Sequence, residues 1–172
     1  RYILNNTIFI SLASYCDDML EFTLKSAFNS AKNKENIFFG VVDQNHVNSR
    51  DTIKSLEFSN QIRYCHIFPD DSLGVSWARH LCFSLYNNEK YFLQVDSHTY
   101  FEENWDENLI IQYKTLLGKS SKPIISTYPY GFSIEENNEI TFKKPSGKTV
   151  LLLRPKKELK IDKQNLVLQF RA

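Results

Sequence analysis

The first half of the chain alternates short apolar runs with segments whose apolar residues recur every three or four positions. Apolar runs rich in β-branched and aromatic residues are typical of strands buried on both faces, as in a parallel sheet. Recurrence at i, i+3 and i+4 is typical of a helix with one buried face. Four strands are therefore predicted at residues 7–13, 36–42, 61–68 and 91–95, and three helices at residues 19–31, 49–58 and 73–86.

The pattern changes after residue 102. Residues 105–117 have apolar residues at helical spacing, and the segments that follow are short, β-rich and separated by turn residues at 136–138 and 145–147. One helix is predicted at residues 105–117, and short strands at residues 123–127, 140–142, 149–153 and 166–170. The chain ends inside the last of these strands, so we expect the domain to be truncated.

Polar clusters follow three of the predicted strands, at residues 14–17, 43–45 and 96–98. Alternating strands and helices favour right-handed βαβ units and a mainly parallel sheet. Ligands of such sheets bind beyond the carboxyl ends of the strands. We therefore expect the three clusters to form one site, and we expect Asp17 or Asp18 to cap the first helix.

Composition excludes several classes of protein. Apolar residues make up 42% and charged residues 24% of the 172 residues, and the net charge of +1 provides no field that would favour nucleic acid. No apolar run is long enough for a membrane span, and the N-terminal residues do not resemble a signal peptide. The cysteines Cys16, Cys65 and Cys82 lack metal-binding spacing, so we expect reduced thiols and a cytoplasmic location.

The candidate for chemistry is Asp96 with His98, two residues apart at the end of a predicted strand. In extended backbone, residues i and i+2 point to the same side of the sheet, so both side chains can approach one cation. A carboxylate oxygen and an imidazole nitrogen suit Mn²⁺, and Mg²⁺ remains possible through the carboxylate. Two protein ligands suffice where phosphate oxygens and water complete the shell. The alternative is an Asp that caps the next turn and a hydrogen-bonded surface His.

A second candidate lies at the start of the helix predicted at 73–86. Gly74 permits a tight turn there, and the N-terminus of a helix can favour a diphosphate. Arg79, about one turn into the helix, can contact a ligand or brace the carboxylate of Asp96. Equally, Arg79 can be a helix residue paired with any carboxylate at the strand ends.

Several stretches resemble the GlcNAc-transferase family that includes the polypeptide α-N-acetylglucosaminyltransferases acting on hydroxyproline. IFISLASYCDD resembles the family's opening strand and loop, and FFGVVDQN resembles its second strand and nucleotide-contacting loop. The most specific block is GVSWARHLCFSLYNNEKYFLQVDSHTYFEENWDENLI, in which an ARH helix leads to a DSH strand end and a Trp-Asp pair. KPIISTYPYGF is similar to the family's next strand, and DSH…W also looks like the mucin-type polypeptide GalNAc-transferases.

The resemblance implies a GT-A fold, that is, an α/β, Rossmann-like, mostly parallel sheet flanked by helices, with a smaller C-terminal part of mixed strands. It also implies a UDP-sugar donor (UDP-GlcNAc in the first instance), a divalent metal, retention of anomeric configuration, and an acceptor polypeptide or glycan. The matching positions are Ser14, Tyr15 and Asp17 for the uridine, Asp43 and Gln44 for the nucleoside side, Arg79 beside the diphosphate, and Asp96 and His98 for the metal.

Departures from the family's pattern limit the comparison. Cys16 stands where the family is expected to have an Arg, which removes a charged contact. The family continues into a Gly-rich segment and an acidic acceptor-side region, so a third metal ligand and much of the acceptor site are expected beyond residue 172. We expect a single domain over 1–172, with a nucleotide-binding part at 1–101 and the start of an acceptor-side part at 102–172.

Three other functions are open on the sequence. An inactive transferase that only binds sugar nucleotides would keep the same motifs. A Rossmann-like dinucleotide enzyme is disfavoured because no G-x-G-x-x-G follows the first strand. A non-catalytic interaction domain would use exposed aromatic residues such as Tyr128 and Tyr130, which flank Pro129 in a predicted loop and can equally be structural.

Overall fold

A computed structural model describes residues 6–136 and 139–143, and the backbone of four short strands after residue 153. The chain divides into two units, Arg1–Lys119 and Ser120–Ala172. The first unit extends past residue 101 and includes the helix predicted at 105–117, because that helix shares a core with the sheet.

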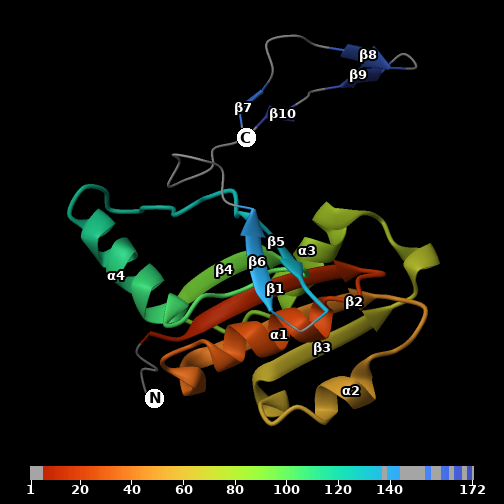
Figure 1. The fold of residues 1–172 in the computed structure, drawn as a ribbon, viewed down its shortest axis with the longest axis horizontal. Coiled ribbons are helices and arrows are strands. Elements are labelled where there is room, and N and C mark those ends of the chain that lie inside the picture. Colours follow the sequence, from red (N-terminus) through yellow and green to blue (C-terminus); the bar gives the residue numbers. More distant parts are fainter. Residues whose placement is uncertain are drawn as a thin grey trace. The chain divides into compact units, whose positions relative to one another are not determined.

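Four parallel strands form the sheet of the first unit (Figure 1). They are β1 (Ile8–Tyr15), β2 (Ile37–Gln44), β3 (Ile62–Ile67) and β4 (Tyr91–Asp96). The spatial order is β3-β2-β1-β4, so the direction of strand addition reverses between β1 and β4. All four predicted strands and the predicted α/β class are confirmed. In open α/β sheets, ligands bind at such a reversal.

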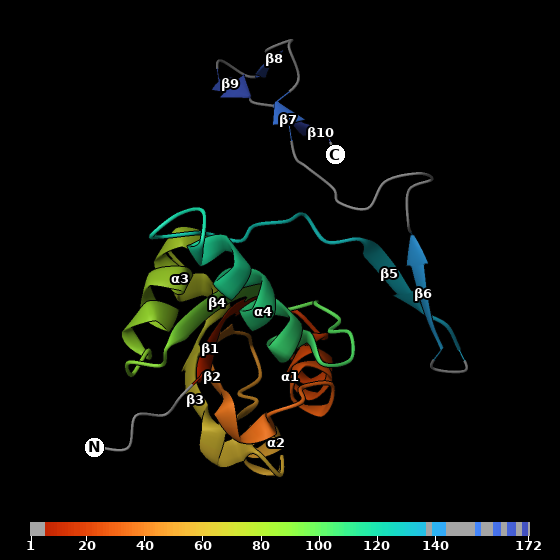
Figure 2. The same cartoon turned by 90° about the vertical axis from the view of Figure 1, so that its left-hand side faces the viewer.

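Helices cover both faces of this sheet, as Figure 2 shows with α1 and α3 on opposite sides. The α-helices are α1 (Leu20–Asn29), α2 (Arg50–Lys54), α3 (Val75–Ser84) and α4 (Trp105–Leu117), and the 3-10 helices are η1 (Lys34–Asn36), η2 (Ser59–Gln61) and η3 (Pro69–Asp71). The four predicted helices are therefore confirmed, and for α4 the predicted bounds are those observed.

Two cores result from the alternation of side chains along the strands. The larger core joins one face of the sheet to α1, α2 and α4, and contains fully buried residues such as Ile10, Leu24 and Phe39. The smaller core lies under α3 around Val42 and Cys82. Full burial of each large apolar side chain contributes about 1.5–3 kcal/mol, so the larger core accounts for most of the stabilisation.

The start of α1 differs from the expected cap. The N-cap residue is Met19, whose side chain makes no capping hydrogen bond. Oδ1 of Asp17 accepts a hydrogen bond from the backbone N–H of Met19 at 2.9 Å, which is a turn outside the helix rather than a bond to its first turn. The expected capping by Asp17 or Asp18 is therefore wrong, because Asp17 is engaged elsewhere, as described below.

Gly40 in β2 is required by a close approach of the neighbouring strand, because a Cβ atom there would overlap the ring of Phe9. We expect Gly40→Ala to lower the free energy of unfolding by about 1–3 kcal/mol, the usual cost of overpacking. The control is Gly118→Ala, where the new Cβ would lie 3.6 Å from the carbonyl oxygen of Thr115, an ordinary contact. Urea denaturation measures both, and equal losses in the two variants would contradict the prediction.

The second unit contains an antiparallel hairpin of β5 (Gly131–Ile134) and β6 (Ile140–Lys143). Two short antiparallel pairs follow, β7 (Arg154–Pro155) with β10 (Phe170–Arg171), and β8 (Lys160–Asp162) with β9 (Asn165–Val167). The predicted strand at 140–142 is confirmed, and β9 and β10 overlap the one at 166–170. The strand predicted at 149–153 lies outside the described residues.

The strand predicted at 123–127 is wrong, since this segment has no regular structure. Ile124 is 89% exposed. Strands satisfy their backbone N–H and C=O groups by pairing, so an apolar run without a partner strand does not form one. The hairpin strand β5 was missed, because its four residues are too few for alternation to be visible.

Candidate functional site

The loops that follow β1 and β4 meet through the carboxylate of Asp17. Oδ2 accepts hydrogen bonds from Oγ of Ser97 at 2.6 Å and from Nδ1 of His98 at 2.8 Å. Burial alone would raise the pKa of Asp17, but the hydrogen bonds from Ser97, His98 and the Met19 N–H outweigh burial, and the pKa lies below its usual value. Asp17 is therefore a carboxylate at neutral pH and acts as a fixed acceptor.

The segment after β4 is a bend held by α1, not an extension of the strand. β4 ends at Asp96. Oγ1 of Thr23 donates to the carbonyl of Ser97 at 2.6 Å and accepts from the N–H of Thr99 at 2.9 Å. The expectation that strand alternation aligns Asp96 with His98 is therefore wrong, because the extended backbone stops one residue too early. The hydrogen bond to Asp17 is what orients His98.

Asp96 lies at the last position of β4, on the sheet face covered by α3, beside its register partner Ala13 in β1. Its Oδ1 is 3.3 Å from a guanidinium nitrogen of Arg79, and the two side chains are 64% and 40% exposed. An ion pair this exposed contributes less than about 1 kcal/mol to stability. Both charges therefore remain available to a ligand.

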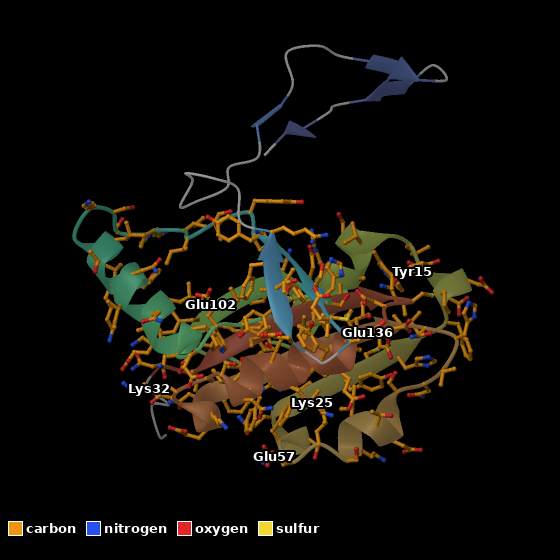
Figure 3. All side chains as sticks on the ribbon, viewed as in Figure 1. Tyr15, Lys25, Lys32, Glu57, Glu102 and Glu136 are labelled. Atoms are coloured by element: carbon orange, nitrogen blue, oxygen red, sulfur yellow. The ribbon has the colours of Figure 1, made fainter. Side chains whose placement is uncertain are left out.

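A hollow of about 380 Å³ opens at the carboxyl ends of β1 and β2, against the start of α3. Its lining residues are Ala13, Tyr15, Gln44, Pro69, Ser72, Gly74 and Val75. Tyr15 is 58% exposed at the end of β1, where Figure 3 labels it. Because Ala13 lines the hollow and pairs with Asp96, the hollow and the end of β4 are neighbours along one edge of the sheet.

Gln44 presents a fixed amide at this hollow. Its Nε2 donates to the carbonyl of Ser14 at 3.0 Å, and its Oε1 accepts from Oγ of Ser72 at 2.6 Å. The same Ser72 Oγ accepts from the N–H of Gly74 at 3.2 Å. Gly74 has φ of 96°, a conformation that favours glycine, and no side chain caps α3. The expected glycine turn at this helix start is confirmed.

Ser14 and Asp43 lie at the ends of β1 and β2 but point to the sheet face opposite the hollow, which is the face of the larger core. They are register partners in β1 and β2, with exposed fractions of 0% and 1%. Oδ2 of Asp43 accepts from the hydroxyl of Tyr64 at 2.8 Å, and burial together with this carboxylate raises the pKa of Tyr64. Among the described residues, neither Oγ of Ser14 nor Oδ1 of Asp43 has a hydrogen-bond partner. Both oxygens are buried on that face and do not line the hollow.

The structure brings the predicted residues together in three places. Asp17 contacts His98, Asp96 contacts Arg79, and Tyr15 and Gln44 share the hollow. Sequence reasoning missed Ser72 and Ser97, which hold Gln44 and Asp17 through hydrogen bonds, and Thr23, which holds the backbone of the loop after β4. For Ser97 a signal existed, because it lies between the two candidate ligands. No group of three or more His, Cys, Asp or Glu residues near one point occurs in the part of the chain that the structure describes.

The fold and site define an α/β protein with a hollow at the carboxyl ends of β1 and β2, next to the reversal of strand order between β1 and β4. A sequence model of the family named Glycosyltransferase (GlcNAc) matches residues 7–58 and 48–154. The chain belongs to this glycosyltransferase family, whose members are transferases with a sugar donor and an acceptor. No match is found among curated proteins. Among the described residues, no helix is both long and apolar enough to cross a membrane.

Proposed function

We propose that this chain binds a UDP-sugar together with a divalent metal ion and transfers GlcNAc, or a related sugar, to an acceptor hydroxyl. The observation that carries the proposal is the position of Asp96 at the end of β4, beside Ala13, which lines the hollow at the ends of β1 and β2. His98 follows two residues later and is held by Asp17 in the loop after β1. Membership in the family supports glycosyl transfer in general. The donor, the metal and the acceptor are the parts that we propose.

The hollow is suited to the nucleoside. Its volume of about 380 Å³ falls within the range of small-molecule pockets. Tyr15 offers an exposed ring for stacking, and Gln44 offers an amide already oriented by Ser72. Asp43, which the family resemblance places on the nucleoside side, points to the opposite sheet face, where its carboxylate accepts from the Tyr64 hydroxyl. We therefore propose that it supports the end of β2 and that Tyr15 and Gln44 make the contacts with the base. This assigns the base to the β2 side.

The diphosphate then extends toward α3 and β4. The uncapped N-terminus of α3 begins at the hollow, at Gly74 and Val75, and backbone N–H groups at a helix start favour phosphate oxygens. Arg79, 3.3 Å from Asp96, adds a positive charge on the same side of the sheet. We therefore propose that Arg79 contacts the diphosphate beside Asp96.

A metal ion fits the donor atoms at the end of β4. Asp96 supplies an exposed carboxylate, and His98 supplies a ring nitrogen on a side chain that is 63% exposed. One oxygen and one nitrogen ligand suit Mn²⁺, or Mg²⁺ through the oxygen, when phosphates and water complete the coordination. A bound divalent cation supplies Lewis-acid stabilisation of the charge that develops on the leaving UDP.

The residues of this chain contribute binding and electrostatics rather than a covalent step. Arg79 would stabilise negative charge on the leaving diphosphate. We propose attack by the acceptor hydroxyl on the face that UDP leaves. The bond between the anomeric carbon and the diphosphate oxygen breaks, the acceptor oxygen bonds to the anomeric carbon with retention of configuration, and the hydroxyl proton passes to the departing diphosphate oxygen. The transition state would have oxocarbenium character, as in glycoside chemistry. The acceptor would be a polypeptide or a glycan.

The proposal is tested by calorimetric titration of the protein with UDP-GlcNAc, with Mn²⁺ and with EDTA. We expect Mn²⁺ to strengthen binding at least about tenfold, since a metal held by both protein and diphosphate adds at least 1.4 kcal/mol. GDP compared with UDP, both with Mn²⁺, is the matched control for the base. Equal affinity for UDP-GlcNAc with and without Mn²⁺ would contradict the proposed metal, and equal affinity for UDP and GDP would contradict the proposed uridine contact. Tight binding without sugar transfer or donor hydrolysis would support the inactive alternative.

A further inference from the structure

We infer that Asp17 fixes the tautomer and the orientation of the His98 ring, and so acts as a positioning residue for metal binding. The inference rests on the proposed function, because it concerns the metal site. It assigns Asp17 a role different from the uridine contact that the family resemblance implies.

The Asp17 carboxylate is engaged in hydrogen bonds within the protein. Its side chain is 17% exposed, and its oxygens accept three hydrogen bonds, from Met19 N, Ser97 Oγ and His98 Nδ1, at 2.6–2.9 Å. Two of these donors lie about 80 residues away in the chain, in the loop after β4. A carboxylate engaged by three internal donors is poorly suited to a new ligand, but it is well suited to hold two loops together.

The contact with Asp17 determines which nitrogen of His98 is available. A carboxylate only accepts hydrogen bonds, so Nδ1, at 2.8 Å from Oδ2, must carry the proton. In the neutral imidazole the lone pair is then on Nε2, which is the atom that can bind a metal. Metal-ligating His residues characteristically donate their other ring N–H to a carboxylate in this way.

The backbone before Asp17 explains how its side chain reaches the loop after β4. Cys16 has φ of 47°, a left-handed conformation that costs a non-glycine residue roughly 1–2 kcal/mol. Its N–H donates to the carbonyl of Gln44 at 2.9 Å, which closes the turn against β2. The chain thus leaves β1 sharply and presents Asp17 toward β4. Strain of this kind is found where a side chain must be placed for function.

The decisive variant is Asp17→Asn. The backbone N–H of Met19 can only donate, so hydrogen bonding is best satisfied when the new amide oxygen faces Met19 and the amide NH₂ faces Ser97 and His98. The NH₂ group donates, so Nδ1 of His98 must then accept, and its proton moves to Nε2. The variant keeps the size of the side chain and its hydrogen bonds but blocks the nitrogen that would bind the metal.

Two measurements report this change without any assay of catalysis. Imidazole ¹⁵N NMR, recorded at a pH above which the His98 signals no longer change, is expected to show the Nδ1–H tautomer in the wild type and the Nε2–H tautomer in Asp17→Asn. Mn²⁺ titration followed by EPR in the presence of UDP is expected to show affinity weakened about 10- to 100-fold. Ser97→Ala is the matched control, because it removes a different hydrogen bond to the same oxygen and leaves the His98 contact in place.

The outcomes separate the inference from the function on which it rests. An Asp17→Asn protein that keeps the Nδ1–H tautomer, or that binds Mn²⁺ as tightly as the wild type, overturns the inference alone. An equal loss of Mn²⁺ affinity in Ser97→Ala also overturns it, since the role of Asp17 would then be to hold the loops only. A wild-type protein that binds no Mn²⁺ in the presence of UDP overturns the proposed function, and the inference with it.

Discussion

Replacing Asp96 by alanine is expected to abolish metal-dependent binding of the UDP-sugar while leaving the protein folded. Asp96 supplies the only carboxylate that we propose for the metal, and a cation shared with a diphosphate is worth several kcal/mol, so the affinity measured with Mn²⁺ should fall at least about 100-fold. The fold should survive, because the Asp96 side chain is 64% exposed and its ion pair with Arg79 is long, at 3.3 Å.

The measurement is calorimetry with UDP and Mn²⁺, paired with thermal unfolding of each variant. Glu57→Ala is the control for the loss of an exposed carboxylate elsewhere, since Glu57 lies at the edge of the first unit away from Tyr15 (Figure 3). It should bind like the wild type. Unchanged Mn²⁺-dependent affinity in Asp96→Ala would remove the metal from the proposed mechanism, and an equal loss in Glu57→Ala would trace the effect to net charge.

The sheet and its helices were predictable because each depends on a local pattern. The strands β1 and β2 are buried and therefore apolar along most of their length, and β3 and β4 are partly buried. The helix α4 carries Trp105 and Ile110 at core-facing positions. The segment at 123–127 has the same local composition as a strand but pairs with no strand in the described part of the chain, and no local pattern contains that information. The α/β class followed from sequence, whereas the end of β4 at Asp96 did not, because hydrogen bonds from Thr23 on α1 determine it.

The candidate site was predictable only as a set of strand ends. A carboxylate and an imidazole after a buried strand indicated a metal, and parallel topology indicated that the loops after β1, β2 and β4 lie on one edge. The contact of Asp17 with His98 spans 81 residues and depends on the left-handed turn at Cys16, which no spacing rule predicts. Burial of Asp43 on the sheet face opposite the hollow was equally hidden, since it depends on the hydroxyl of Tyr64 in the neighbouring strand.

Replacing Asp106 by alanine is expected to cause the largest loss of stability of any exchange considered for this protein. Asp106 is 1% exposed at the start of α4, and its carboxylate accepts hydrogen bonds from the N–H groups of Lys32 and Asn33 and from the Asn33 amide, at 2.8–3.0 Å. The exchange leaves these donors without their acceptor, at a cost of about 3–5 kcal/mol. The control is Glu107→Ala, whose carboxylate pairs with Lys32 at the surface and contributes less than about 1 kcal/mol.

Urea denaturation at several pH values tests both the size and the cause of this loss. Burial alone would raise the pKa of Asp106, but the N–H of Lys32 and the two donors of Asn33 outweigh it, and the pKa lies below its usual 3.8. A depressed folded-state pKa stabilises the protein fully above the unfolded-state value, and this contribution is lost as the pH falls through the folded-state pKa. The difference in free energy of unfolding between wild type and Asp106→Ala should therefore be constant near neutral pH. It should become smaller only below about pH 4, as the carboxyl group of the folded protein takes up its proton. If this difference in free energy of unfolding stayed the same below that pH, packing rather than the charged hydrogen bonds would hold α4 to the loop after α1.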